Sequence, residues 1–167
     1  MRTVARLLPV IAFGFLVNCA PSPSATVEAN KEVVRQLTSA INDRDFDLLD
    51  ELVAPDVVRH SQATAGVDVR SLQQFNQFLG QDLTTFPDAQ QEIQILIGEG
   101  DKVAMYLTLT GTQDGPMGPF PPTGKAVVVK FLGIMRLEQG KVAEIWVEWD
   151  NLNILTQLGH FPPAGKD

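Results

Sequence analysis

The sequence predicts one α+β domain, in which helices come first and a run of antiparallel strands follows. Two patterns along the chain indicate this order. Apolar residues recur every three or four positions between residues 26 and 86, as in helices, and alternate with other residues between 92 and 149, as in strands. The chain has 167 residues, 44% of them hydrophobic and 20% charged, so a single domain, predicted at residues 26–160, can bury a core.

Three helices are predicted in the first half of this domain, each from an N-terminal cap, an apolar stripe and a residue that stops it. The predicted caps are Thr26, Asp45 and Asp68, and the corresponding ends are Asn42–Asp43, Pro55–Asp56 and Phe86. The third helix stops at Phe86 because the proline that follows disfavours helix in the preceding residue. Its stripe contains three phenylalanines, which is typical of a buried core.

The strands are predicted at residues 57–60, 92–97, 103–110, 125–136 and 141–149. The second and third, joined by a short turn, should form a hairpin. The fourth is almost continuously apolar, which predicts a central strand covered on both faces. The preceding segment, 111–124, is rich in glycine and proline but includes Met117 and Phe120, so we expect it to fold over an opening.

The first eighteen residues are interpreted as a signal peptide and set apart from the fold. Arg2 and Arg6 precede an apolar run at residues 7–17 that is too short to span a bilayer, and small residues follow it. This pattern predicts an exported protein. Residues 161–167 are assigned to a C-terminal tail.

Cys19, the single cysteine, follows Leu16-Val17-Asn18 in an arrangement that resembles a bacterial lipobox. We expect it to be lipidated and to anchor a cell-envelope lipoprotein, with residues 19–25 as a tether. The alternative is cleavage near Ala20 or Ala25, which would give a soluble periplasmic or secreted protein.

The charge and the motifs exclude several classes of partner. The formal net charge is −7, and loss of the signal peptide removes two arginines and no acidic residue. Phosphate contacts need clustered Lys and Arg, so we expect no nucleic-acid partner and no membrane contact except through a lipid anchor. The two histidines, His60 and His160, are a hundred residues apart and no glycine-rich phosphate motif is present, so no metal or cofactor is expected.

Asp150 is the main candidate for chemistry. It ends the last predicted strand beside Trp149, and a desolvated carboxylate there would have a raised pKa and serve as a general base. The alternative is that Asp150 caps the short amphipathic segment that follows. Strand alternation places Asp150 opposite the apolar face of Ile145, Val147 and Trp149, unless a bulge near Val147 reverses the parity.

Short motifs between residues 30 and 159 occur in an order that resembles the SnoaL-like polyketide cyclases, or ester cyclases, of the NTF2-like superfamily. Each motif has two to four residues, and an ordered set of about ten carries the resemblance. The motifs are Asn42-Asp43-Arg44-Asp45, Leu52, Val57-Val58-Arg59-His60, Phe86-Pro87-Asp88, Gly100-Asp101-Lys102-Val103, Gly111-Thr112, Pro121-Pro122-Thr123-Gly124, Gly140-Lys141-Val142, Glu144, Trp146, Asp150 and Gln157-Leu158-Gly159. The usual Gly-Thr-His of the family ends in Gln113 here.

The resemblance implies a cone: a curved antiparallel sheet wrapped by the three helices around a deep apolar pocket. In characterised members an aspartate at the strand end acts as acid/base in an aldol closure without metal or organic cofactor, and Asp150 is the matching position. His60 is expected as a second polar group at the mouth of the pocket. The residues predicted to line the pocket are Trp146, Tyr106, Phe78 and Phe86.

Three functions are compatible with these residues. The first is a cofactor-independent cyclase or isomerase acting on a small apolar carbonyl compound. The second is a non-catalytic module that binds a small apolar molecule in the same cone. The third is an interaction domain, and the resemblance also implies a homodimer formed through the outer face of the sheet.

Overall fold

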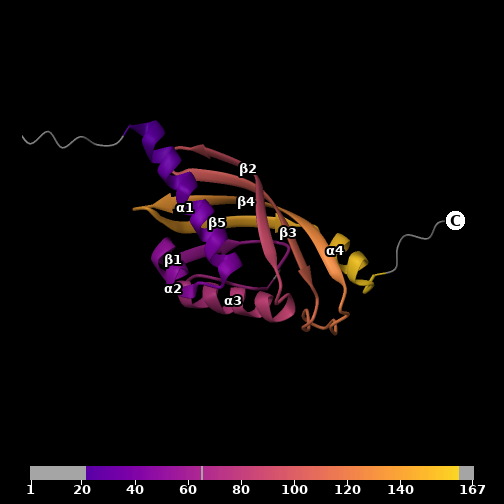
Figure 1. The fold of residues 1–167 in the computed structure, drawn as a ribbon. Helices are drawn as coiled ribbons and strands as arrows, with labels where there is room; N and C mark the ends of the chain where they lie inside the picture. The colour runs from indigo at the N-terminus through magenta and orange to yellow at the C-terminus, as the bar shows by residue number, and fades with distance from the viewer. Residues whose placement is uncertain (1–21, 65, 162–167) are drawn as a thin grey trace, which may run out of the picture.

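The computed structural model describes residues 22–64 and 66–161, and this part of the chain forms four helices and five strands (Figure 1). They are α1 (Pro23–Asp43), α2 (Phe46–Leu52), β1 (Val53–His60), α3 (Leu72–Thr85), β2 (Gln90–Glu99), β3 (Lys102–Thr112), β4 (Ala126–Glu138), β5 (Lys141–Trp149) and α4 (Asn151–Leu158). This order confirms the predicted α+β class. The predicted signal peptide, the lipidation of Cys19 and the tail beyond residue 161 lie outside the described residues. None of the described helices is long and apolar enough to cross a membrane.

The five strands form one curved sheet in the order β1-β5-β4-β3-β2. Strands β2 to β5 pair antiparallel, and β2 and β3 form the predicted hairpin. Strand β1 departs from the predicted antiparallel sheet, because it pairs with β5 in parallel. A parallel pair needs a long crossover connection, and all the elements from α3 to β4 lie between these two strands in the chain.

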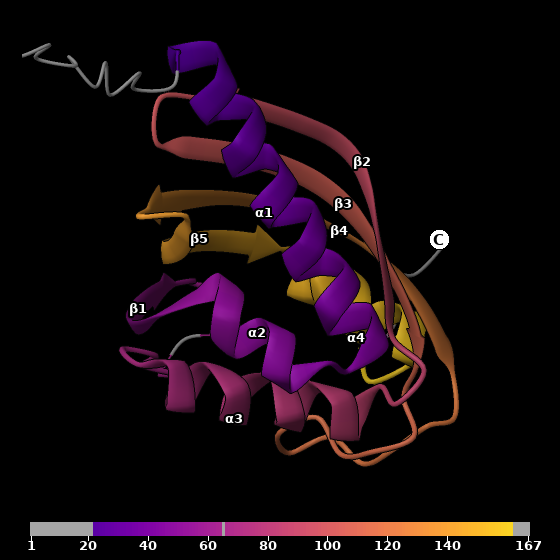
Figure 2. The same ribbon diagram turned by 60° about the vertical axis from the view of Figure 1, so that its left-hand side comes forward.

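The helices cover one face of the sheet. Figure 2 shows α1 crossing the concave side in front of β2 and β3, while α3 lies along the edge formed by β1. Helix α4 packs on β4 at the far end. A cavity lies between the sheet and these helices, as the family resemblance implies.

Local capping explains where the helices begin. The predicted cap Asp45 is confirmed, since its side chain accepts a hydrogen bond from the backbone N–H of Leu48 at 3.0 Å. The other two caps are Ser22 and Ser71 instead of the predicted Thr26 and Asp68. Ser22 is followed directly by a proline, which suits the first position of a helix, so α1 starts one turn before the predicted cap.

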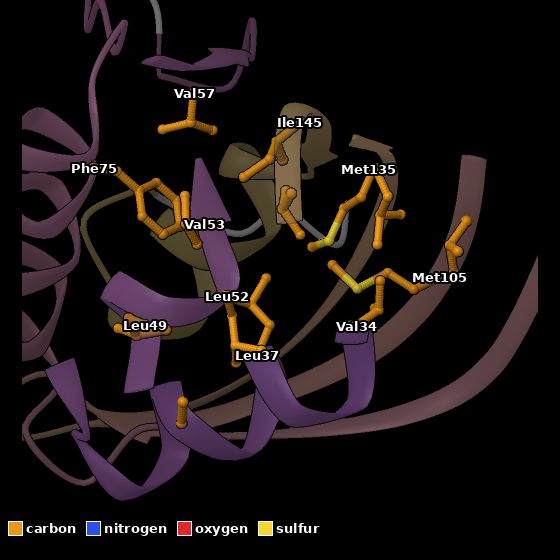
Figure 3. Close-up of a cluster of buried hydrophobic side chains, with 14 of the residues drawn as sticks. Val34, Leu37, Leu49, Leu52, Val53, Val57, Phe75, Met105, Met135 and Ile145 are labelled. Atoms are coloured by element: carbon orange, nitrogen blue, oxygen red, sulfur yellow. The ribbon is translucent and has the colours of Figure 1, made fainter. Parts of the chain in front are cut away.

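The core lies where the first two helices meet the sheet (Figure 3). Val34 and Leu37 of α1, Leu49 of α2 and Phe75 of α3 belong to one cluster with Met105 and Met135 of the sheet, and all six are buried. Truncation of such a leucine to alanine costs about 2–5 kcal/mol. This cluster holds α1 and α3 at fixed distances from the sheet.

Strand β4 is central, as predicted, but only one of its faces is covered. Val128, Leu132 and Ile134 point away from the helices and are 55%, 60% and 40% exposed. Residues between them, such as Val127, Val129 and Met135, are buried. The prediction of a strand covered on both faces was wrong for the single chain, because α1 to α4 lie on the concave side.

Candidate active site

A cavity of about 660 Å³ lies between the concave face of the sheet, helices α1, α3 and α4, and the loop 113–124. Its wall is mostly apolar, with residues such as Ile41, Phe75, Leu107, Phe131, Val147 and Ile154. A volume of this size and character is typical of a small-molecule site.

The glycine- and proline-rich loop covers one end of the cavity, as expected. Met117, Gly118, Pro119 and Phe120 line it. The backbone N–H groups of residues 114 and 115 donate to the carbonyl oxygen of Thr85 at 3.0 and 3.1 Å, which ties the loop to the end of α3.

Gln113 holds the base of this loop and does not line the cavity. Its side chain is fully buried, donates to the carbonyl oxygen of Pro121 at 3.1 Å and accepts from the hydroxyl of Thr123 at 2.9 Å. His160 lies 3.2 Å from the same amide oxygen and its ring packs against Phe120. The residue that replaces the family histidine therefore has a structural role.

Arg59 brings a positive charge to the cavity wall. It follows Val57 on the inward side of β1 and is only 6% exposed. Its guanidinium carbon lies 4.2 Å from the ring centre of Phe78 and 5.6 Å from that of Trp149, and its Nη1 donates to the Thr64 hydroxyl at 2.8 Å. Burial lowers the pKa of Arg59, although an arginine this basic stays charged.

Asp82 lines the same cavity from α3. It lies one turn after Phe78 and one turn before Phe86, so it shares the apolar stripe of this helix. Desolvation raises the pKa of its carboxyl from 3.8 to about 6, and the charge of Arg59 opposes this shift. By surface area the residue is nevertheless exposed, so its carboxyl is partly desolvated and still open to solvent.

The two charges are near each other without being in direct contact. Each affects the pKa of the other, yet no ion pair joins Arg59 to Asp82 among the salt bridges of the described residues. They are also the only charged residues among those described that line the cavity. The cavity thus presents one acid and one cation on an apolar background.

Of the residues predicted to line the pocket, the structure brings two to the cavity. Phe78 and Phe86 line it. Tyr106 and Trp146 do not, since they alternate with the cavity-lining residues Leu107 and Val147 and so lie on the outer face of the sheet. For these two aromatic residues the structure corrects the prediction.

Asp150 caps helix α4, as the alternative interpretation proposed. Its Oδ1 accepts a hydrogen bond from the backbone N–H of Asn153 at 2.9 Å, and the residue is exposed and absent from the cavity wall. The pairing of β4 with β5 is regular around Val147, and the irregularity falls near Ala143 instead. The catalytic role of Asp150 stays a prediction, without a contact to the cavity.

His60 also lies on the outer face. Its Nε2 is 2.8 Å from the carboxylate of Glu144, and its ring stacks on Trp146 with centroids 5.2 Å apart. The hydrogen bond from His60, followed by that from Arg136, lowers the pKa of Glu144. A catalytic role of His60 stays a prediction, and the structure does not bring it together with Asp150 or the cavity.

Reasoning from the sequence missed Arg59 and Asp82, although both leave a signal. Arg59 is two residues after the buried Val57, so the two residues share a face and a charge lies on the inward side of the strand. Asp82 stands at a four-residue step from Phe78 inside an apolar helix stripe. A charged residue at an apolar position of a helix or strand pattern indicates a buried polar site.

No group of three or more metal-binding side chains occurs in the residues that the structure describes.

Comparison with known proteins identifies the family. The family model of SnoaL-like polyketide cyclase matches residues 31–158. The chain belongs to the SnoaL-like polyketide cyclase family. A search of the curated proteins finds no match for this family member.

Several solved structures resemble this SnoaL-like protein over most of its length. IdmH from Streptomyces antibioticus is 31% identical with a TM-score of 0.70, and the match covers 78% of this chain and 98% of IdmH. AclR from Streptomyces galilaeus is 28% identical with a TM-score of 0.72, covering 84% and 87%. A SnoaL-like protein from Jannaschia sp. CCS1 is 26% identical with a TM-score of 0.74, covering 87% and 100%.

Proposed function

We propose that this SnoaL-like protein is a cofactor-independent cyclase or isomerase that acts on a small, mostly apolar carbonyl compound. The observation that carries the proposal is the position of Asp82 in an apolar cavity, facing the same space as a buried arginine. The family of this protein agrees with such a reaction. We assign the acid/base role to Asp82 in preference to Asp150, because Asp82 lines the cavity and Asp150 does not.

The chemistry follows from the pKa of the carboxyl. A base that removes a proton next to a carbonyl group works best when its pKa is near the working pH, and burial moves Asp82 in that direction. Asp82 would take the proton from the α-carbon, and the electron pair of that C–H bond would form an enolate. In a cyclase the enolate carbon would attack a second carbonyl carbon, and the alkoxide formed there would take the proton back from Asp82. In an isomerase the substrate would be an unsaturated ketone, and its conjugated enolate would take the proton back from Asp82 at a more distant carbon.

The exchange of α-protons for deuterium tests this proposal before the natural substrate is found. The wild-type protein in D₂O is incubated with apolar cyclic ketones that fit the cavity, such as 2-tetralone and larger fused-ring ketones, and NMR follows the loss of the α-proton signal. We expect exchange above the buffer rate, and a loss of about 100-fold or more in Asp82→Asn.

Asp150→Asn is the matched variant in the same assay. Asparagine caps a helix about as well as aspartate, so the fold is retained while the second carboxylate is removed. We expect wild-type exchange in Asp150→Asn. If Asp150→Asn loses exchange while Asp82→Asn keeps it, the assignment to Asp82 is wrong and the prediction from the sequence is right.

The non-catalytic binding module is the second candidate, favoured by the replacement of the family histidine with the structural Gln113. In that case ketones would bind in the cavity, with no exchange above buffer in any variant. Binding is measured by changes in tryptophan fluorescence, because Trp149 lines the cavity. Binding without exchange indicates the non-catalytic module, and binding with exchange indicates the enzyme.

We also propose that the outer face of the sheet joins two copies of the chain. Ile95 and Ile97 of β2 and Leu132 and Ile134 of β4 form an apolar patch on either side of β3, and they are between 40% and 64% exposed. Arg136 and Glu144 at its border provide both signs of charge. A patch with both signs of charge suits the self-complementary contact of a twofold dimer.

A further inference from the structure

The guanidinium of Arg59 has hydrogen-bonding capacity that the described protein does not use. A guanidinium has five N–H donors, and only the bond from Nη1 to Thr64 is present among the described residues. None of its nitrogen atoms is among the buried polar atoms without a partner in the part of the chain that the structure describes. The remaining N–H groups therefore reach space that water or a ligand can occupy, and Arg59 lines the cavity.

The surroundings of Arg59 fix its orientation. The Phe78 ring lies over the guanidinium, the Trp149 ring lies further off, and Thr64 holds one nitrogen. Donors that are held in place before the ligand arrives lose little freedom on binding, and they stabilise an oxyanion more strongly than water does.

The charged groups that act on Arg59 are Asp82 of α3 and Glu148 of β5. The carboxylate of Glu148 already accepts the backbone N–H groups of Gln62 and Ala63 at 2.7 and 2.9 Å. Asp82 makes no hydrogen bond through its carboxylate among the described residues, so it is the group whose protonation changes the net charge of the cavity. A negative ligand oxygen and the ionised Asp82 would compete for the same cation.

We propose that Arg59 is an oxyanion-binding residue and that the cavity takes apolar molecules that carry one acidic oxygen, of which a phenol is a stable example. The inference deepens the proposed function, because the enolate formed by Asp82 is such an oxygen. When Asp82 holds the proton that it has removed, its own charge is gone and the negative charge of the enolate oxygen faces Arg59. With Asp82 neutral, the negative charge of the enolate oxygen and the positive charge of Arg59 cancel within the apolar cavity.

A coloured phenol measures the oxyanion preference directly. The probe is 4-hydroxy-4′-nitrobiphenyl, whose phenolate absorbs at a longer wavelength than the phenol, so the pKa of the bound probe is read by spectrophotometric titration. In Asp82→Asn the cavity keeps Arg59 as its one charge, and we expect the pKa of the bound probe to fall at least about one unit below that of the free probe, which is tenfold tighter binding of phenolate than of phenol.

Two further variants complete the design. In Arg59→Met the apolar cavity disfavours charge, so the pKa of the bound probe should rise above the free value. Arg136→Met removes the same charge from the outer face and should leave the pKa of the bound probe as in wild type. The wild-type protein should show a smaller fall than Asp82→Asn, because the ionised Asp82 repels the phenolate.

The proposal is overturned if the probe shows no saturable binding, if its pKa in Asp82→Asn is not below the free value, or if Arg59→Met and Arg136→Met give the same value. Should Arg59→Met fail to fold, the Asp82→Asn titration decides alone. A lowered probe pKa without ketone exchange would reject catalysis and keep the oxyanion site. Ketone exchange without a lowered probe pKa would reject the oxyanion site and keep catalysis.

Discussion

Asp82 and Arg59 show how a cavity changes the chemistry of ordinary side chains. An aspartate on a solvated helix surface is a weak base at neutral pH, whereas desolvation raises the pKa of Asp82 to about 6. Arg59 limits that increase because a nearby positive charge favours the carboxylate. Burial and the cation therefore act in opposite directions, and burial has the larger effect.

The raised pKa of Asp82 predicts a pH dependence of stability. Between pH 3.8 and about 6 the folded protein holds a proton on Asp82 that the unfolded chain has lost, so this group stabilises the fold below pH 3.8 and its contribution is lost as the pH rises through about 6. Asp82→Asn lacks this contribution. The free energy of unfolding of Asp82→Asn relative to wild type should therefore rise across this window and stay constant above it, in urea titrations at several pH values.

Asp88 provides a control of opposite sign. Hydrogen bonds from the backbone and hydroxyl of Thr112 lower the pKa of Asp88, so its contribution is present above its ordinary pKa of 3.8 and lost as the pH falls. The difference in the free energy of unfolding between Asp88→Asn and wild type should therefore change at acid pH. If Asp82→Asn follows the same course as Asp88→Asn, the raised pKa of Asp82 is contradicted.

Among individual residues, the sequence predicted two of the aromatic side chains that line the cavity but missed Arg59 and Asp82. Periodicity placed Phe78 and Phe86 on the inward stripe of α3, which is typical of a core. The family resemblance assigned them to the pocket, and both line the cavity. Asp150 looked like a site residue because it ends a strand beside a tryptophan, but an aspartate at that position also satisfies the first N–H groups of the next helix. Periodicity does not tell which of two carboxylates reaches a cavity.

The elements follow the sequence closely where a local signal sets them. The end of α1 at Asp43, the cap Asp45 and the end of α3 before Pro87 all agree with the predictions. Strand β1 begins at Val53 instead of residue 57 and passes through Pro55. An edge strand tolerates proline, and only the assembled sheet shows that β1 lies at an edge.

The last helix predicts a difference between two substitutions at one position. Asp150→Ala removes the side-chain acceptor for the N–H of Asn153 and should lower the free energy of unfolding by about 1 kcal/mol. Asp150→Asn keeps an acceptor and should change stability by less. Chemical denaturation of both variants measures this difference, and equal losses would contradict the capping role.

The whole molecule has a covered face and an open one. The described helices pack on the concave side of the sheet, and the convex side exposes isoleucine and leucine side chains that no other described element covers. The continuous apolar run of β4 predicts a strand that is covered on both faces. A single chain covers one face, and the proposed second copy would cover the other.

Sedimentation of the domain tests this association. We expect wild type to sediment as a dimer and Leu132→Glu as a folded monomer, because the substitution places a charge within the apolar patch. Val67→Glu changes an equally apolar residue that is 45% exposed on the segment before α3, and it should remain dimeric. A monomeric wild type, or a dimeric Leu132→Glu, would reject the outer face as the contact.

The titration of Asp82 tests the proposed acid/base site without any substrate. Protein labelled with ¹³C at the aspartate carboxyl carbons is followed by NMR from acid to neutral pH, and Asp82→Asn assigns the signal. We predict a midpoint at about 6 that rises further in Arg59→Gln, since Arg59 lowers it. A midpoint near 3.8 that does not move in Arg59→Gln would show that Asp82 is an ordinary solvated carboxylate and would contradict the site.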